Sequence, residues 1–375
     1  MKLFKLQDRY QAFRRRSSKR PGEPHGVLLV SSGGLGDTVL FALVLPRFLA
    51  LANDGEAVTV LLRKGSDKMA FLFPGRVSVE TVDFGRLRKD LSYRCGVCER
   101  LFAANTRLVV HTDYLRHPHL DEALVAACEA PETLAMEPRP WAKYDADLKA
   151  NRSLYDRLFD SGGKHLNKVL RWHRFADWLS GTKAPLPEPC IAENRLPPAA
   201  NEPGPLVLIQ PFSAVKEKQS PVELYRRIVE QLPGDCRIVI TGGPSDLERN
   251  PEFQELLAMA NVEFDGSNFH DLVARLRAAD LVISVDTACM HLAGVVGAPT
   301  LCLASAAYVG EMVPYDASLT PPKVRFLYQT MPCEGCLGAC SLPAENGMWP
   351  CVARLDHDAV ITAATEMAKT CSSAG

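Results

Sequence analysis

The stretch Gly26-Val-Leu-Leu-Val-Ser-Ser-Gly-Gly-Leu-Gly-Asp37 decides the fold class. Its first six residues form a short apolar run, which is typical of a strand buried on both faces of a parallel sheet. A glycine-rich turn follows, and the apolar stretch over residues 38–52 predicts a helix. A strand, a turn and a helix in this order predict the first unit of an α/β fold.

The same alternation continues along the chain. In the first half it predicts strands over 57–62, 77–82 and 107–112, a helix over 87–104, and a mostly helical stretch over 120–178. In the second half it predicts strands over 206–209, 237–241, 281–285 and 300–303, and helices over 221–232, 253–260, 271–279, 286–297 and 356–369. Ser220 and Glu223 have the spacing of a capping box at the start of the first of these helices.

Two similar βα domains are therefore expected, over 23–182 and 206–355. Seven prolines between residues 183 and 205 disfavour helix and sheet, so this segment is expected to be a linker. A basic arm over 1–22 precedes the domains, and a helix with a tail over 356–375 follows them. Ligands of open α/β sheets bind beyond the carboxyl ends of the strands, so two such domains predict a cleft.

Composition excludes several classes of protein. The chain has 375 residues, 47% hydrophobic and 23% charged, which is a globular composition rather than a disordered or fibrous one. Lysine and arginine number 43 against 44 acids, so there is no overall basic field for binding nucleic acid. Arg47 interrupts the longest apolar window, and no apolar segment follows the first cations. We expect a soluble, cytoplasmic protein.

The N-terminal arm combines cations with apolar residues. Leu3, Phe4, Leu6, Tyr10 and Phe13 loosely fit one stripe of a helix. Contact with an anionic membrane surface and a solvated, frayed end explain this pattern equally well.

Three strand-to-helix junctions carry groups suited to ligand binding. The first, Gly33 to Asp37, matches neither a dinucleotide fingerprint nor a P-loop. Asp37 could be a helix N-cap or a general base, and the spacing alone favours the N-cap. A polar loop after the strand at 107–112 contains Tyr114, Arg116, His117 and His119, which suit either acceptor contacts or a solvated loop.

The second and third junctions suit a phosphate ligand. The loop from Gln210 to Pro221 supplies hydroxyl and ammonium groups, although a solvated lysine loop would look alike. The segment Asp286-Thr-Ala-Cys-Met-His291 combines a carboxylate, a hydroxyl and the free N–H groups of a helix start. A lone histidine such as His291 is usually a core or surface residue, but here it lies about one turn inside the helix.

Together these motifs resemble glycosyltransferase family 9, the heptosyltransferase family. The family's ordered motifs correspond here to Gly36-Asp37, Lys218–Pro221, Gly242-Gly243-Pro244 and Asp286–Ala293, spread between residue 27 and about residue 360. The sequence departs from the family pattern at Ala288, where glycine is usual, at Cys289, where proline is common, and at Ser220, where an aromatic residue is usual.

The resemblance implies an α/β fold of the GT-B type, with two Rossmann-like domains facing each other across a cleft. It implies inverting sugar transfer without a catalytic metal, with the acceptor on 23–182 and the nucleotide sugar on 206–355. Asp37 would be the general base, and Lys218 would stabilise the departing diphosphate. The implied donor-binding residues are Ser213, Gly242, Gly243, Asp246, Glu248, Asp286, Thr287, Ala288 and His291.

The family's usual donor is ADP-heptose, and its usual acceptor is the lipopolysaccharide core or another cell-surface glycan or glycolipid. Such a partner places the chain in the cytoplasm, peripherally at the inner membrane surface. Two alternatives remain at this point: a nucleotide-sugar epimerase of the same fold, and a degenerate binding protein, which the departures at Ala288 and Cys289 would suit.

Four of the twelve cysteines form a tight cluster: Cys333, Cys336, Cys340 and Cys351. Four thiolates within 19 residues suit a structural Zn²⁺ site, and the resemblance to protein heptosyltransferases with iron makes Fe a second candidate. Reduced thiols or a disulfide are the alternatives.

Overall fold

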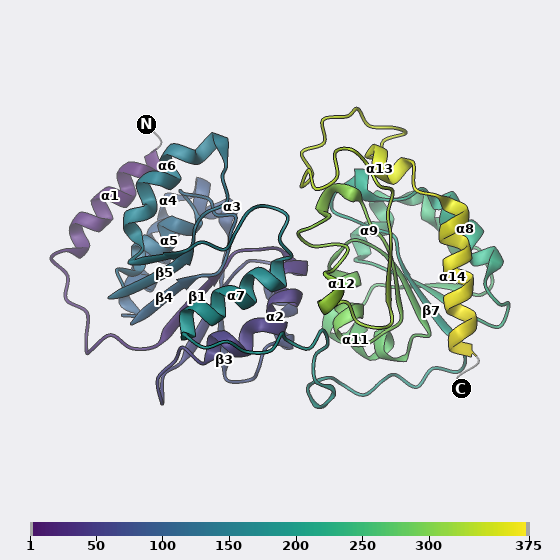
Figure 1. The fold of residues 1–375 in the computed structure, drawn as a ribbon, viewed down its shortest axis with the longest axis horizontal. Helices are drawn as coiled ribbons and strands as arrows, with labels where there is room; N and C mark the ends of the chain where they lie inside the picture. Colours follow the sequence, from purple (N-terminus) through teal and green to yellow (C-terminus); the bar gives the residue numbers. More distant parts are fainter. Residues whose placement is uncertain (1–2, 373–375) are drawn as a thin grey trace. The chain divides into compact units, whose positions relative to one another are not determined.

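The structure is a computed structural model that describes residues 3–372. The chain forms two compact units. Unit 1 comprises the residues up to Lys164 together with Val169–Pro185, and unit 2 comprises His165–Lys168 together with the residues from Leu186 onward. The proline-rich segment thus contains the passage from unit 1 to unit 2 at residues 185 and 186, and its only helical turn is Glu193–Arg195. Each unit contains one parallel sheet flanked by helices (Figure 1).

Unit 1 contains a six-stranded sheet in the order β3-β2-β1-β4-β5-β6, and every neighbouring pair is parallel. Its strands are β1 (Val27–Ser31), β2 (Val58–Arg63), β3 (Val77–Val82), β4 (Leu108–His111), β5 (Glu132–Met136) and β6 (Arg157–Phe159). Its helices are α1 (Leu3–Arg15), α2 (Leu35–Leu49), α3 (Phe84–Lys89), α4 (Leu91–Ala103), α5 (Asp121–Cys128), α6 (Asp145–Ala150) and α7 (Lys168–Ser180). All five residues of β1 are buried, as the apolar run predicted.

Unit 2 repeats this topology, with a second parallel sheet in the order β12-β11-β10-β7-β8-β9. Its strands are β7 (Leu206–Gln210), β8 (Arg237–Thr241), β9 (Val262–Asp265), β10 (Leu281–Val285), β11 (Thr300–Leu303) and β12 (Val324–Leu327). Its helices are α8 (Val222–Gln231), α9 (Pro244–Arg249), α10 (Gln254–Leu257), α11 (Phe269–Ala278), α12 (Ala288–Val295), α13 (Pro350–Ala353) and α14 (His357–Ser372). The α/β class and the pair of Rossmann-like sheets are confirmed.

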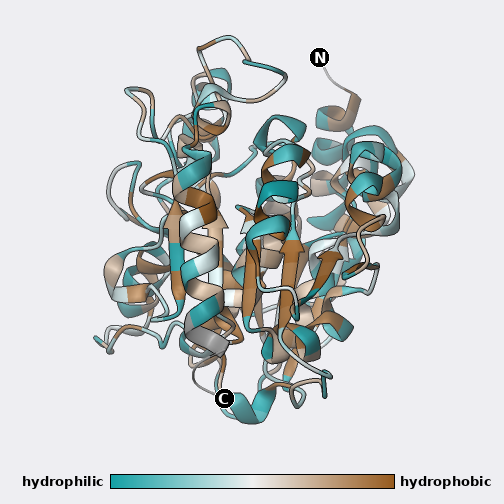
Figure 2. Cartoon of the chain, turned by 90° about the vertical axis from the view of Figure 1, so that its right-hand side faces the viewer, coloured by the Kyte–Doolittle hydropathy of each residue, from teal (hydrophilic) through white to brown (hydrophobic). Residues whose placement is uncertain are grey.

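Each unit has its own hydrophobic core. In unit 2 the core joins β7, β8 and β10 to α8 and to α14, whose Val360, Ala363 and Ala364 are fully buried. The last helix is therefore an integral part of unit 2. Figure 2 colours the strands predominantly as hydrophobic and the surrounding helices as mixed, which is the pattern of a sheet covered on both faces.

Several expectations about individual elements were wrong. The stretch 120–178 is not mostly helical, because it contains β5 and β6 between short helices. Short apolar runs do not distinguish a buried strand from a helix segment by periodicity alone. The expected helix over 87–104 is two helices, because Asp90 caps the second of them by accepting a hydrogen bond from the Tyr93 N–H. The capping box at Ser220 is also absent, since α8 starts one residue later with Pro221 at its N-cap.

Candidate functional site

Both sheets contain a topological switch point, where the chain turns from one half of the sheet to the other. In unit 2 it lies between β7 and β10, and in unit 1 between β1 and β4. Open α/β sheets bind ligands at the carboxyl ends of the strands beside such a point. The predicted donor residues follow β7, β8 and β10, which are adjacent strands, so unit 2 brings their junctions to one edge of the sheet.

A buried ion pair spans the switch point of unit 2. The Lys218 ammonium contacts the Asp286 carboxylate and donates a 2.7 Å hydrogen bond to the Asp286 carbonyl. It also lies 4.8 Å from the centre of the Tyr308 ring. The side chains of Lys218 and Asp286 are only 9% and 1% exposed, so the alternative of a solvated lysine loop does not hold for Lys218. Burial raises the pKa of Asp286, while the Lys218 ammonium and the Ser305 hydroxyl, 2.9 Å from Asp286 Oδ2, oppose this rise.

The start of α12 is held by the end of β7. The Thr287 hydroxyl donates to the Gln210 side-chain oxygen at 2.9 Å, and the Ser284 hydroxyl donates to the same oxygen at 3.2 Å. Thr287 is the N-cap residue of α12, and its side chain makes no cap hydrogen bond. Thr287 and Ala288 are half-buried, so the first turn of α12 is partly accessible to a ligand.

His291 faces the interior of unit 2. Its Nδ1 lies 2.6 Å from the Tyr315 hydroxyl, the two rings are stacked, and His291 is 3% exposed. This geometry is that of a core histidine, which was the alternative to a donor contact. The hydrogen bond to Tyr315 fixes the imidazole beneath the first turn of α12.

The remaining donor candidates lie on two loops. After β8, Gly243 donates its N–H to Asp246 Oδ2 at 2.7 Å, and Glu248 is exposed on α9. A Cβ at Gly242 would lie 2.6 Å from the Phe212 ring, so close packing requires glycine there. After β7, the Ser213 hydroxyl accepts from the Val215 N–H at 3.1 Å.

Asp37 occupies the third position of α2 in unit 1. Gly34 is the N-cap, and Asp37 Oδ2 accepts the Gly34 N–H at 2.7 Å, so the N-cap prediction for Asp37 was wrong. The contact is the counterpart of that between Gly243 and Asp246 in unit 2. A Cβ at Gly33 would lie 2.6 Å from the Asp37 Cβ, so glycine leaves room for this half-buried carboxylate.

An acidic residue that the sequence did not single out lies across the switch point of unit 1. Asp113 follows β4, and its Oδ2 accepts hydrogen bonds from the Ser32 N–H at 2.6 Å and from the Ser32 hydroxyl at 2.9 Å. The Trp172 indole N–H donates to the Thr112 carbonyl at 2.8 Å and holds this loop from the other side. Its place two residues after a central strand was the signal that could have identified Asp113.

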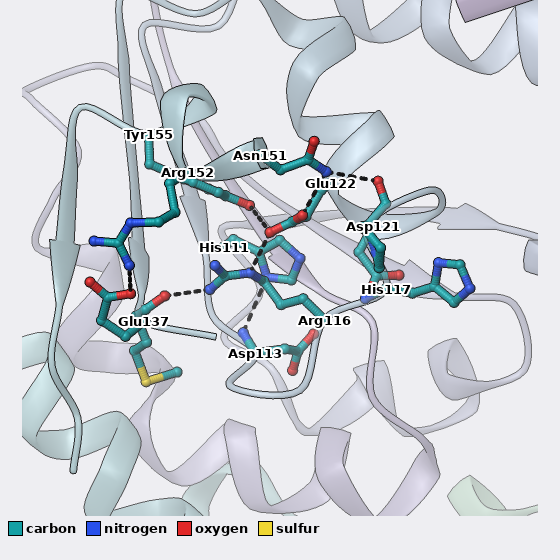
Figure 3. Close-up of polar contacts among 12 residues, drawn as sticks. His111, Asp113, Arg116, His117, Asp121, Glu122, Glu137, Asn151, Arg152 and Tyr155 are labelled. Carbon is teal, nitrogen blue, oxygen red and sulfur yellow. Dashed lines mark hydrogen bonds and ion pairs between the residues drawn. The ribbon is translucent and has the colours of Figure 1, made fainter. Parts of the chain in front are cut away.

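The loop after β4 encloses a buried ion pair (Figure 3). Arg116 Nε donates to Glu122 Oε1 at 2.9 Å, and both side chains are 1% exposed. Arg116 also donates to the Met136 carbonyl, and Glu122 accepts from the Asn151 amide at 2.8 Å and from the Tyr155 hydroxyl at 3.3 Å. Arg116 therefore stabilises the loop and is not available to an acceptor, contrary to the expectation for this segment.

Two further titratable groups that Figure 3 labels, His111 and Asp121, are buried. Burial lowers the pKa of His111 well below its ordinary value, and its Nε2 has no partner among the residues that the structure describes. Burial raises the pKa of Asp121 to about 7, although its carboxylate accepts the His117 N–H at 2.7 Å. Both groups are thus neutral over part of the physiological range.

The four clustered cysteines are free and line one small cavity with Ala306, Met331 and Trp349. The cysteine loop is attached beside the candidate site, since the Trp349 N–H donates to the Glu217 carbonyl at 3.0 Å. Within residues 3–372, however, no three His, Cys, Asp or Glu side chains are arranged to hold a metal ion. The arrangement of the thiols does not fit the predicted Zn or Fe site, which therefore has no support here.

Comparison with known proteins identifies a family domain in just under half of the chain. Residues 153–335 match the model of glycosyltransferase family 9 (heptosyltransferase). The chain carries a family 9 glycosyltransferase domain. It is thus a glycosyltransferase, and the resemblance seen in the motifs is confirmed. Lys218, Asp286 and His291 lie within the matched range, whereas Asp37 lies outside it. No curated protein matches the chain.

Solved structures show the same GT-B fold. A glycosyl transferase of family 9 from Veillonella parvula has a TM-score of 0.67 at 17% identity, over 93% of this chain and 98% of that chain. The heptosyltransferase WaaC of E. coli with ADP has a TM-score of 0.65 at 20% identity, over 91% and 99%. The ADP-heptose lps heptosyltransferase II of E. coli has a TM-score of 0.62 at 13% identity, over 92% and 99%. None of the described helices is long and apolar enough to span a membrane.

Proposed function

We propose that this glycosyltransferase moves a heptose from ADP-heptose to a lipopolysaccharide core or another cell-surface glycan, with inversion at the anomeric carbon. The observation that carries the proposal is the ordered donor edge of unit 2, where Lys218, Asp286 and the start of α12 meet at the switch point. The family match covers this edge. The donor is inferred from similar structures, because WaaC was solved with ADP and with ADP-2-deoxy-2-fluoro heptose.

In this proposal the diphosphate binds at the start of α12, beside the Thr287 side chain and the backbone N–H of Ala288. A helix start offers backbone N–H groups to an anion, and α12 is held there by Gln210. Lys218 contributes positive charge next to that turn and stabilises the leaving diphosphate. Because its ammonium already contacts Asp286, binding of the diphosphate would compete with that carboxylate for the same cation.

The sugar and the nucleoside would contact the surrounding loops. Asp286 would hold the donor sugar and phosphate, with Ser213 beside it. His291, which is buried against Tyr315, would contribute to donor binding by supporting the first turn of α12. Gly242 and Gly243 would allow close approach of the nucleotide, and Asp246 or Glu248 would bind the ribose. Asp246 is already engaged by Gly243 and by Arg249, at 2.7 and 2.5 Å, so Glu248 is the less constrained of these two carboxylates.

Asp37 would be the general base that removes the proton from the acceptor hydroxyl. Its carboxylate is half-buried at the switch point of unit 1 and held by the Gly34 N–H. A general base must lie within hydrogen-bond reach of the proton that it abstracts. We place the acceptor on unit 1, and the reaction at the cytoplasmic surface of the inner membrane.

The decisive variant is Asp37→Asn. The amide oxygen of asparagine can still accept the Gly34 N–H, but it cannot take up a proton, so the substitution separates catalysis from helix capping. We expect transfer from ADP-heptose to a core glycan to fall by about 100-fold or more, with ADP affinity unchanged in calorimetry. Asp83→Asn, at the N-cap of α3, is the matched control and should leave transfer intact. Full activity of Asp37→Asn would refute the assignment of the base.

A further inference from the structure

The polar face of α1 attaches this helix to unit 1. Asp8 accepts two hydrogen bonds from the Arg94 guanidinium, at 2.7 and 2.6 Å, and the Arg94 side chain is only 1% exposed. Arg15 donates to Glu129 at 2.9 Å and is 9% exposed, and Lys5 pairs with Asp147 at 3.1 Å. An ordinary surface helix buries its apolar face instead. The orientation of α1 is therefore the reverse of the usual one.

The opposite face of α1 is an apolar stripe in solvent. Leu3, Leu6, Tyr10 and Phe13 are 72%, 48%, 57% and 68% exposed. Their spacing of three and four residues places them along one side of a helix. Phe4 alone turns inward, where it is 9% exposed and its ring lies 4.9 Å from the Arg94 guanidinium, so the fifth residue of the predicted stripe does not belong to it.

The apolar stripe is not exposed because the space between α1 and the rest of unit 1 is already filled. A cavity of about 400 Å³ lies between α1 and the helices α4 and α5, and side chains such as Arg15, Cys95 and His119 line it. The stripe could cover apolar surface only by rotating α1, and rotation would break the Asp8–Arg94 and Arg15–Glu129 contacts. The ion pairs therefore determine which side of the helix faces outward.

The exposed charges that the N-terminal segment itself places beside the stripe have one sign, although Arg14 also lies 4.0 Å from the carboxylate of Glu99 on α4. The exposed cations Arg9, Arg14, Arg16 and Lys19 lie on or just after α1. At 100° per residue, Arg9 and Arg14 flank the stripe on its two sides. Asp8, the only acid in the first 20 residues, is on the inner face with Arg94. The outward face of this segment thus presents apolar and cationic groups and no carboxylate.

We propose that α1 lies in the surface of an anionic membrane. Leu3, Leu6, Tyr10 and Phe13 would enter the boundary between headgroups and acyl chains, and the four cations would contact anionic headgroups. A surface with aromatic and aliphatic groups between cations is complementary to such a membrane. The inference deepens the proposed function and rests on it for the biological role, since a glycolipid acceptor lies in a membrane. Its structural evidence is independent of the transfer chemistry.

Vesicle sedimentation with the full chain tests the proposal. We expect the chain to bind vesicles of phosphatidylcholine with phosphatidylglycerol and to bind pure phosphatidylcholine at least tenfold more weakly. Arg9→Gln and Arg16→Gln should each weaken binding about fivefold, the effect of one cation near the surface. The double variant Leu6→Ser, Phe13→Ser should abolish binding. Leu91→Ser, which changes an exposed leucine outside α1, should bind as the unaltered chain does.

ADP affinity and transfer to a water-soluble acceptor fragment separate the two proposals. The double variant Leu6→Ser, Phe13→Ser should retain ADP affinity and transfer to the soluble fragment. The two substituted side chains are exposed, and α1 belongs to unit 1. Equal binding to both kinds of vesicle, or unchanged binding of the double variant, would overturn the membrane inference. The inference would also be overturned if the unaltered chain were a dimer in solution and only the double variant Leu6→Ser, Phe13→Ser were a monomer. If the unaltered chain bound vesicles but did not transfer heptose from ADP-heptose, that result would count against the proposed function and not against the membrane inference.

Discussion

Removing the buried ammonium of Lys218 should destabilise unit 2 in a way that depends on pH. In Lys218→Met the length of the side chain is nearly kept, so no large cavity forms. The Asp286 carboxylate, only 1% exposed, keeps the Ser305 hydroxyl but loses its counter-ion. A buried carboxylate without a cation takes up a proton instead of remaining charged, and its pKa rises.

The proton sets the size of the effect. Protonating a carboxyl group of ordinary pKa 3.8 costs about 1.36 kcal/mol for each pH unit above that pKa. At pH 7 the variant can therefore lose at most about 4 kcal/mol of its free energy of unfolding through Asp286. At pH 5 the same limit is about 1.6 kcal/mol. The folded variant holds a proton that the unfolded chain releases above pH 3.8, so its stability relative to the unaltered protein falls as the pH rises.

Scanning calorimetry at the two pH values measures this difference. For a unit of this size about 1 kcal/mol shifts Tm by roughly 2–4 °C, so the limits are a fall of about 8–16 °C at pH 7 and about 3–6 °C at pH 5. Arg227→Met is the control in the same unit, because Arg227 is 41% exposed and pairs with the exposed Asp358. It should cost less than about 1 kcal/mol. The reasoning is refuted if Lys218→Met shifts Tm by less than about 2 °C at pH 7, or equally at both pH values.

Two further variants test unit 1. Gly33→Ala places a Cβ 2.6 Å from the Asp37 Cβ and must displace that side chain, so transfer should fall while calorimetry finds ADP affinity unchanged; normal transfer would show that the position of Asp37 is not critical. Asp121→Asn retains an acceptor for the His117 N–H but removes a buried carboxyl group whose pKa is about 7. Between pH 3.8 and 7 the folded unaltered protein binds more protons than the unfolded chain, so its stability falls as the pH rises across that range. The Tm of the variant minus that of the unaltered protein should therefore be larger at pH 8 than at pH 5. Equal Tm differences at the two pH values would contradict the raised pKa of Asp121.

The sequence predicted eight strands, the edge strand β3 among them, and missed the interior strand β5 and three short edge strands. β1, β4, β7 and β10 are buried on both faces and read as continuous apolar runs. By contrast, β6, β9 and β12 lie at sheet edges and have only three or four residues. Such a strand pairs on one side only, and its neighbour determines its register, so a local pattern has little to detect.

The candidate site shows a similar division. Glycines and carboxylates next to predicted strands could be placed at the switch points, because topology alone brings those junctions together. The pairing of Lys218 with Asp286 joins residues 68 positions apart, and burial of Arg116 depends on Glu122, Met136 and Asn151. A charged residue in a loop reads as solvated unless its partner is known, so the sequence could not distinguish a ligand-binding cation from a buried structural one.

The N-terminal helix shows why a correct pattern could still leave two interpretations open. Helical spacing establishes that Leu3, Leu6, Tyr10 and Phe13 share a side, but it does not say whether that side is buried or exposed. Which side faces outward is determined by Arg94, a residue distant in the sequence that donates hydrogen bonds to both carboxylate oxygens of Asp8. Because that contact turns the polar face inward, the arm is neither frayed nor packed by its apolar residues. The same cations that looked like a solvated end then border an apolar surface, and this combination of charge and exposure is what favours a membrane over water as its neighbour.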